Sequence, residues 1–147
     1  MDLGKDDKRV GFLLERTTRI VKLCFTKAFA QLEVDITPEQ WVVLDTLVQE
    51  GPMSQVDIAQ IIFKNTPTVS RLIDQLERKG FLNREPSDED RRATIISITT
   101  QGKKLVDQCL PEVKRLRDLT WEGLNEKEYQ QFTRIIDQVF KNMQSYQ

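Results

Sequence analysis

The sequence NTPTVSRLIDQLERKG, residues 65–80, decides the fold of this chain. Asn65 is a good helix N-cap, and Pro67 is tolerated in a first turn, where its missing N–H costs nothing. Gly80 follows two basic residues, as is typical of a helix C-terminus. Four apolar residues between these ends recur at helical spacing and predict one buried face: Val69, Leu72, Ile73 and Leu76. The stretch therefore predicts a helix over residues 66–80 that presents short polar side chains and Arg71 to a partner.

A shorter helix is predicted before this one, and two strands after it. Ser54 and Asp57 form an S-x-x-D helix start, and the apolar face is expected to consist of Val56, Ala59, Ile62 and Phe63. Two helices joined by a few residues make a helix-turn-helix arrangement. Residues 81–84 and 94–98 have strand composition, and residues 85–92 between them have turn composition and end in two arginines. Two strands with a charged tip after a helix-turn-helix describe a wing.

Three pieces of this region resemble the MarR family of bacterial transcriptional regulators. They are PTVSRLIDQLERKG at residues 67–80, DRR at 90–92 and ITTQG at 98–102. The family pattern is a V-[ST]-R helix ending in L-E-x-x-G, a D-x-R wing and an L-T-x-x-G start of the next helix; Ile98 replaces the leucine. The resemblance covers nearly the whole chain and implies a mainly α fold with a small β-wing. Residues 36–99 would form the winged helix-turn-helix lobe, with dimerisation helices at residues 1–35 and 100–147.

Residues suited to DNA contacts lie at the start of the 66–80 helix and in the wing. Arg71 is expected to read a base in the major groove; the alternatives are a phosphate clamp or an ion pair with Asp74 or Glu77. Arg92 matches the arginine of the family's wing pattern, and we expect the Asp90 carboxylate to hold its guanidinium before it enters the minor groove. The full set expected at the DNA is Asn65, Thr66, Thr68, Ser70, Arg71, Arg84, Asp90, Arg91 and Arg92.

Amphipathic helices are predicted on both sides of the winged region. Residues 7–33 indicate one long helix, and the sequence TPEQ at 37–40 opens a second, whose buried stripe is expected to be Trp41, Leu44, Leu47 and Val48. A helix beginning near Thr99 contains Pro111, where we expect a kink, and a last helix begins at Asn125. Because a helix-turn-helix protein usually binds a palindrome as a two-fold dimer, we expect the terminal helices to dimerise. The dimer stripe is expected to include Ile135, Ile136, Val139 and Phe140.

Composition narrows the classes of function. The chain has 147 residues, of which 39% are hydrophobic and 31% charged, with a formal net charge of −1, which is typical of a globular protein. Residues 54–99 contain seven basic and seven acidic side chains, so DNA binding depends on where the arginines lie, and a winged module that binds protein is the alternative. The sequence has no histidine and no C-x-x-C, so we expect no enzyme, metal site or cofactor. The polar N-terminus and the lack of a long apolar run predict a cytoplasmic protein with no membrane segment.

The predicted function is a homodimeric transcriptional regulator, a ligand-responsive repressor that binds a palindromic operator in double-stranded DNA. The resemblance implies a small aromatic or amphipathic effector between the dimer helices and the winged lobe. Its expected contacts are Phe12, Arg16, Trp41 and Leu44, with Arg16 available to an anionic group, although the three apolar residues are more often core. The alternative switch is oxidation of Cys24 or Cys109. Cys24 lies on the apolar stripe of the first helix and is expected to be buried, so a ligand is favoured over a thiol.

Overall fold

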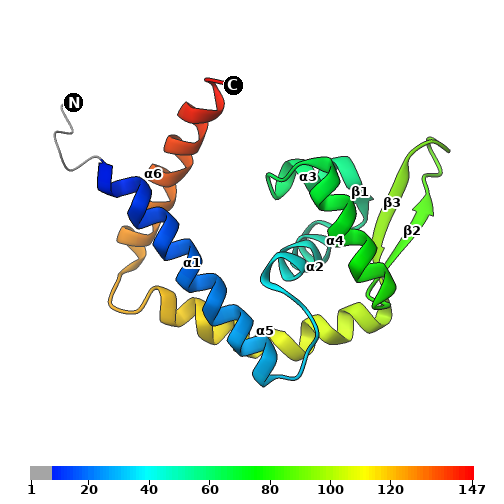
Figure 1. Ribbon diagram of the computed structural model, residues 1–147, viewed down its shortest axis with the longest axis horizontal. Coiled ribbons are helices and arrows are strands. Elements are labelled where there is room, and N and C mark those ends of the chain that lie inside the picture. The colour runs from blue at the N-terminus through cyan, green and yellow to red at the C-terminus, as the bar shows by residue number, and fades with distance from the viewer. Residues whose placement is uncertain (1–7) are drawn as a thin grey trace. The chain divides into compact units, whose positions relative to one another are not determined.

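The structure is a computed structural model that describes residues 8–147, and in this range the chain forms six helices and one three-stranded sheet (Figure 1). The fold is mainly α with a small antiparallel sheet, as the sequence predicts. The helices are α1 (Lys8–Gln31), α2 (Pro38–Glu50), α3 (Gln55–Ile61), α4 (Thr66–Arg78), α5 (Thr100–Thr120) and α6 (Glu126–Gln144). The strands are β1 (Met53–Ser54), β2 (Leu82–Pro86) and β3 (Thr94–Ile98).

The chain divides into two compact units, which meet within α5. The first ends at Glu112 and contains α1 to α4 and the sheet, and the second is Val113–Gln147. The core of the first unit is built by side chains from α2, α3, α4, β2 and β3, all below 2% exposed: Val43, Leu44, Ile58, Val69, Ile73, Leu76, Leu82 and Ile96. The lobe boundaries expected at residues 35 and 99 remain a prediction.

Both ends of α4 are set by the residues that the sequence indicates. At the start, the Asn65 Oδ1 atom accepts a hydrogen bond from the Thr68 backbone N–H at 2.9 Å. After the end, Gly80 has φ of +85°, and the Phe81 N–H donates to the Leu76 carbonyl at 2.9 Å. This is a Schellman motif, in which glycine accepts the left-handed conformation without steric cost. The predicted helix and its buried face are therefore confirmed.

Two other helices end in the same geometry without a glycine. Glu33 follows α1 with φ of +57°, and Phe63 follows α3 with φ of +51°. In each case the next residue donates its N–H to the carbonyl five residues back, at 3.1 Å from Val34 and 3.0 Å from Lys64. The left-handed conformation costs an L-residue about 1–2 kcal/mol. The turn between α3 and α4 is therefore formed around a strained aromatic residue.

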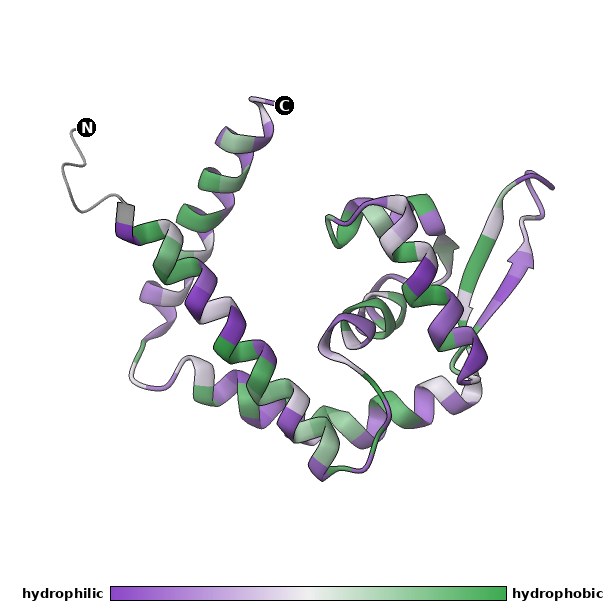
Figure 2. Ribbon diagram, viewed as in Figure 1, coloured by the Kyte–Doolittle hydropathy of each residue, from purple (hydrophilic) through white to green (hydrophobic). Residues whose placement is uncertain are grey.

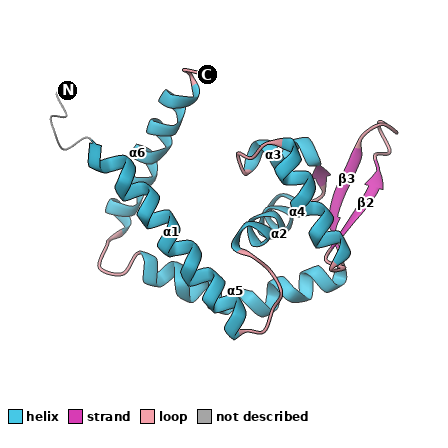
Figure 3. Ribbon diagram, viewed as in Figure 1, coloured by secondary structure: helices cyan, strands magenta, loops and turns pink. Residues whose placement is uncertain are grey.

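The wing consists of β2 and β3, which pair antiparallel with Leu82 opposite Ile98 and Pro86 opposite Thr94 (Figure 3). β1 pairs with the other edge of β3, so the strand order is β1-β3-β2. The sequence did not predict β1, because a strand of two residues has no alternation to recognise. Through β1, the chain between α2 and α3 joins the sheet that carries the wing.

Thr99 and Gly102 fasten the start of α5 to the turn after α4. The Thr99 hydroxyl donates to the Gly80 carbonyl at 2.7 Å and accepts from the Gly102 N–H at 3.0 Å. A Cβ atom on Gly102 would lie 2.4 Å from the Phe81 carbonyl oxygen, which is closer than real Cβ atoms approach. The ITTQG sequence therefore needs its threonine as a helix cap and its glycine for a close approach of two backbones.

In the second unit, the end of α5 packs against the start of α6. The Trp121 ring lies edge-on to Tyr129, with centroids 4.7 Å apart, and to Phe132, at 5.6 Å. A capping box begins α6, because Asn125 Oδ1 accepts from the Glu128 N–H at 2.9 Å and Glu128 Oε2 accepts from the Asn125 N–H at 2.8 Å. The predicted start of the last helix is confirmed.

Some predicted buried positions are wrong. In α3 the buried residues are Ile58 and Ala59, whereas Val56 and Phe63 are each 57% exposed. The reason is that α3 ends at Ile61, so Phe63 belongs to the turn and not to a helical face. Val48 in α2 is likewise exposed.

The two cysteines differ in their exposure to solvent. Cys24 is exposed, contrary to expectation, and Cys109 is fully buried. Burial raises the pKa of the Cys109 thiol, so its reactive thiolate is disfavoured at neutral pH. Of the two, Cys24 is the thiol that a reagent in solution can reach.

Candidate nucleic-acid interface

The first half of α4 presents the side chains that the sequence selects for base contacts. We call Thr66, Thr68, Ser70 and Arg71 the reader residues. Thr66 and Arg71 are exposed, Thr68 and Ser70 are half-buried, and the opposite face of the helix is in the core. Asn65 is exposed as well, but its side chain oxygen is used by the N-cap. The Arg71 guanidinium has no hydrogen bond or ion pair with any residue in the range 8–147. All N–H groups of the Arg71 guanidinium are therefore available to donate hydrogen bonds to a partner.

Arg84 connects the wing to α4. One of its guanidinium nitrogens lies 2.6 Å from Asp74 Oδ1 and the other 3.2 Å from Glu77 Oε1. The sequence suggested that Arg71 could pair with these carboxylates, but Arg84 takes both. The sequence also placed Arg84 among the DNA contacts, whereas here its guanidinium is bound to α4. Arg84 holds β2 against α4 and neutralises negative charge on that helix.

The tip of the wing is ordered through main-chain hydrogen bonds. The Asp90 carboxylate accepts from the Arg92 backbone N–H at 2.9 Å, and the Ser87 N–H donates to the Ala93 carbonyl at 2.9 Å. The expectation that Asp90 holds the Arg92 guanidinium is therefore wrong, because a short side chain two residues away reaches the main chain first. Arg91 and Arg92 are both exposed, so the turn fixes their backbones and leaves their guanidinium groups in solvent.

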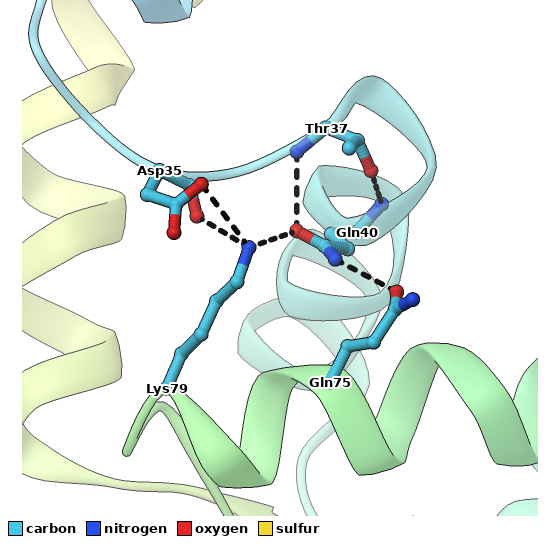
Figure 4. A network of polar contacts seen from close by, with 5 residues as sticks. All are labelled: Asp35, Thr37, Gln40, Gln75 and Lys79. Atoms are coloured by element: carbon cyan, nitrogen blue, oxygen red, sulfur yellow. Dashed lines mark hydrogen bonds and ion pairs between the residues drawn. The ribbon is translucent and has the colours of Figure 1, made fainter.

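A polar network centred on the buried Gln40 joins α4 to α2 (Figure 4), and its other members are Asp35, Thr37, Gln75 and Lys79. Gln40 is only 3% exposed, and its side-chain amide donates to Gln75 Oε1 at 2.9 Å. Lys79 Nζ donates to Gln40 Oε1 at 3.1 Å and to the Asp35 carbonyl at 2.8 Å. Neither Gln75 nor Lys79 is among the residues that the sequence selects for a functional role. The available signal was Gln40, a predicted capping residue that faces the same side as buried Trp41 and Leu44.

The four residues expected to bind an effector do not come together within one chain. Trp41 and Leu44 are in the core, and the Trp41 ring packs against Phe29 with centroids 5.8 Å apart. Phe12 is 63% exposed and lies under the Arg16 guanidinium, 5.9 Å from carbon to ring centroid. Phe12 and Phe29 are seventeen residues apart on one helix, a separation of about 25 Å.

A cavity of about 400 Å³ lies in the first unit between the end of α2, the end of β3 and the first turns of α5. Apolar side chains dominate its walls, and Lys103 and Asp107 add one charge of each sign. The lining residues are Leu47, Val48, Gly51, Pro52, Ser97, Ile98, Lys103, Val106 and Asp107. Its size suits a small organic molecule.

Hydrophobic residues recur along α1 and α6 (Figure 2), and many of their side chains are exposed. No residue of α6 is buried, and Ile135, Val139 and Phe140 are all exposed. On α1 the exposed apolar residues include Val10, Leu13, Ile20 and Leu23. Large exposed apolar patches are typical of surfaces that bind another protein. Among residues 8–147, no helix has the length and apolar character that crossing a bilayer requires, and no cluster of three potential metal ligands is present.

An exposed helix face with a free arginine, set beside a wing with two more, defines a winged helix-turn-helix protein of the DNA-binding class. Residues 36–94 match the model described as MarR family. Staphylococcus aureus MepR, solved in a complex with DNA, is 28% identical to this chain. The two superpose with a TM-score of 0.81 over 90% of this chain and 96% of MepR. An Escherichia coli MarR mutant bound to operator DNA is 22% identical, with a TM-score of 0.82 over 95% and 99%. Bordetella bronchiseptica BpsR is 24% identical, with a TM-score of 0.81 over 95% and 97%. Residues 36–94 therefore form a MarR-family domain, and members of this family solved with DNA are transcriptional regulators.

Proposed function

We propose that this protein is a homodimeric repressor that binds a palindromic operator and is released by a small ligand. The observation that carries the proposal is the difference between the two faces of α4. One face is wholly buried, and the other offers Arg71 with no partner in the described chain. In this proposal α4 enters the major groove, and Arg91 and Arg92 follow the backbone and the minor groove beside it.

The test of base readout compares Arg71→Ala with Arg78→Ala. Both changes remove one exposed arginine from α4, but Arg78 already donates to the Asp74 carbonyl at 3.3 Å and lies in the last turn. We expect Arg71→Ala to weaken operator binding by about 1–3 kcal/mol and to blur the preference at one position in each half-site. Arg78→Ala should weaken operator and random DNA equally and slightly.

Fluorescence anisotropy with operator fragments selected from the source genome measures both effects. An equal loss on operator and random DNA for Arg71→Ala would mean that Arg71 contacts phosphate only. If the wild type binds no genomic fragment even at low salt, the wing is a protein-binding module instead, as its neutral charge allows.

The dimer in this proposal is formed by the terminal helices, with the α6 stripe of Ile135, Ile136, Val139 and Phe140 at its centre. Such interfaces bury about 2,000 Å² or more, and they place the half-sites about 10 base pairs apart. Val139→Glu puts a charge into the stripe and should give monomers at micromolar concentration. Gln138→Glu is the matched control on the polar face. Light scattering distinguishes them, and a wild-type monomer would contradict the proposal.

The effector in this proposal occupies the 400 Å³ cavity beside Val48. DNA binding by BpsR is regulated by 6-hydroxynicotinic acid, and Streptomyces coelicolor PcaV was solved with its natural ligand, so small molecules act on proteins of this fold. A ligand releases DNA only by binding the DNA-free conformation more tightly. Val48→Trp should fill the cavity and abolish release without changing operator affinity, while Val42→Trp, on an exposed site of the same helix, should not.

A panel of phenolic and carboxylate compounds provides the ligands, with peroxide beside it as the test of the thiol alternative. Wild type and Cys24→Ser are compared, because Cys24 is the exposed cysteine. Release by peroxide alone, lost in Cys24→Ser, would make the protein a redox sensor and overturn the ligand proposal.

A further inference from the structure

The apolar contacts of α4 fix where the helix lies and which face is turned to the core, but they hold its exact rotation only loosely. Burial of its apolar stripe is favourable in any nearby orientation, because the hydrophobic effect has no direction. Hydrogen bonds do have direction, and they weaken steeply when donor and acceptor are misaligned. The exact orientation of α4 within the winged lobe therefore depends on its polar contacts as well. Among the described residues most of these contacts lie on the second half of the helix, whereas the first residue receives one long hydrogen bond, from Gln55 Nε2 to the Thr66 carbonyl at 3.5 Å.

The Gln40 amide provides the most demanding of these contacts (Figure 4). Its oxygen accepts from the Thr37 N–H and from Lys79 Nζ, each at 3.1 Å, and its nitrogen donates to Gln75 Oε1 at 2.9 Å. Because Gln40 is buried, a rotation of α4 away from Gln75 and Lys79 would leave polar atoms unpaired in the core. That cost opposes the rotation of α4.

Lys79 extends the same network to the segment between α1 and α2. Its ammonium donates to the Asp35 carbonyl at 2.8 Å and lies 3.4 Å from the Asp35 carboxylate. Asp35 precedes the capping residue Thr37 by two positions. The Lys79 side chain at the end of α4 therefore binds both the linker before α2 and the first turn of α2. The reader residues are on the same helix, with Arg71 about 12 Å from Lys79 along its axis.

We propose that Gln40, Gln75 and Lys79 are positioning residues for DNA recognition: they set the orientation of α4 against α2, and so place the reader residues on the base edges. The inference rests on the proposed function. Contact geometry at such sites has to be held within about 0.5 Å and 10–20°. Loss of the network should therefore reduce discrimination between operator and random DNA, since base contacts need this geometry and phosphate contacts tolerate more.

The test compares Lys79→Met with Arg78→Met. The two residues are neighbours, and each change removes one positive charge from the end of α4. The Gln40→Met/Gln75→Met variant removes both amides, and with them the acceptor of the Thr37 N–H and of Lys79 Nζ, so it disrupts the whole network without leaving one amide of the pair unpaired. For each variant, operator and random DNA affinities, the salt dependence and the thermal midpoint are measured.

In Lys79→Met and in the double variant, the ratio of operator to random affinity should fall by about fivefold or more, the loss expected when one base contact is misplaced. Arg78→Met should keep the wild-type ratio. A purely structural role would lower the thermal midpoint and leave the ratio of the folded protein unchanged, which would overturn the inference.

Amide hydrogen exchange without DNA separates this inference from the proposed function. The α4 amides should exchange faster in Lys79→Met than in Arg78→Met, whether or not an operator has been found. Equal exchange in the two variants overturns the positioning role. A wild type that binds no DNA overturns the proposed function, and the exchange result still decides whether the network holds α4.

Discussion

Replacing Arg84 with methionine tests how the wing and α4 are connected. The change keeps the aliphatic stem and removes the guanidinium that lies 2.6 Å from Asp74 and 3.2 Å from Glu77. The Arg84 side chain is 27% exposed, and the two carboxylate side chains are 48% and 41% exposed. Pairs in this setting are screened by solvent and contribute about 0.2–1 kcal/mol each. We therefore expect Arg84→Met to lower the free energy of unfolding by about 1 kcal/mol, measured by urea denaturation.

The same change should weaken DNA binding through the charges it exposes. With Arg84 gone, Asp74 and Glu77 carry uncompensated charge, and each repels a phosphate about 10 Å away by roughly 0.4 kcal/mol at the dielectric constant of water. Adding Asp74→Asn to Arg84→Met should therefore recover operator affinity. Arg92→Ala should cost more operator affinity than Arg84→Met, with no loss of stability, because the Arg92 side chain is exposed at the tip.

One pattern of results would refute this account of Arg84. In this pattern, Arg84→Met leaves the free energy of unfolding unchanged and lowers the slope of log affinity against log salt concentration by about one. The added Asp74→Asn change then fails to restore operator affinity. The Arg84 guanidinium would then leave α4 and contact phosphate. A larger affinity loss for Arg84→Met than for a well-folded Arg92→Ala would contradict the placement of the wing in the minor groove.

Three further predictions concern stability. Gly102→Ala should lower the free energy of unfolding by about 1–3 kcal/mol, because the added Cβ would collide with the Phe81 carbonyl; urea denaturation measures it. Glu33→Gly should raise it by about 0.5–1 kcal/mol by relieving the left-handed backbone, and no gain would mean that the strain is absent. Desolvation raises the pKa of Glu39, but the backbone N–H at the start of α2 and the Lys22 ammonium at 3.1 Å outweigh it, so the pKa lies below the ordinary 4.5. The stability that comes from this lowered pKa is present above pH 4.5 and is lost as the pH falls through the lower value. Lys22→Met should therefore be about 0.2–1 kcal/mol less stable than wild type at pH 7. This difference in stability should disappear in acid.

Where the determinants are local, the sequence predicted the structure closely. The α4 boundaries follow from Asn65 and Gly80, which act within one helical turn of their own positions. The capping boxes of α2 and α6 are equally local. Such signals are readable because both partners lie within a few residues of each other.

Where the partner is distant in sequence, prediction failed. Gln40 meets Gln75 across 35 positions and Lys79 across 39, and no spacing rule connects them. The Cys24 error has a related cause, because helical periodicity reveals an apolar stripe but not whether the same chain covers it. Arg84 was assigned to DNA by its charge, whereas its partners are set by the pairing of β2 with β3 and the packing of α4.

The contact between Lys79 and Asp35 affects how mutational scans of this chain are interpreted. Its shorter hydrogen bond, 2.8 Å long, runs from Lys79 Nζ to the main-chain carbonyl of Asp35. Every amino acid carries that oxygen, so substitutions at position 35 remove only the weaker contact with the carboxylate. An alanine scan would report position 35 as dispensable and position 79 as sensitive, although both belong to one interaction. Insertions or deletions between α1 and α2 would expose the linker's role instead, since they move the carbonyl itself.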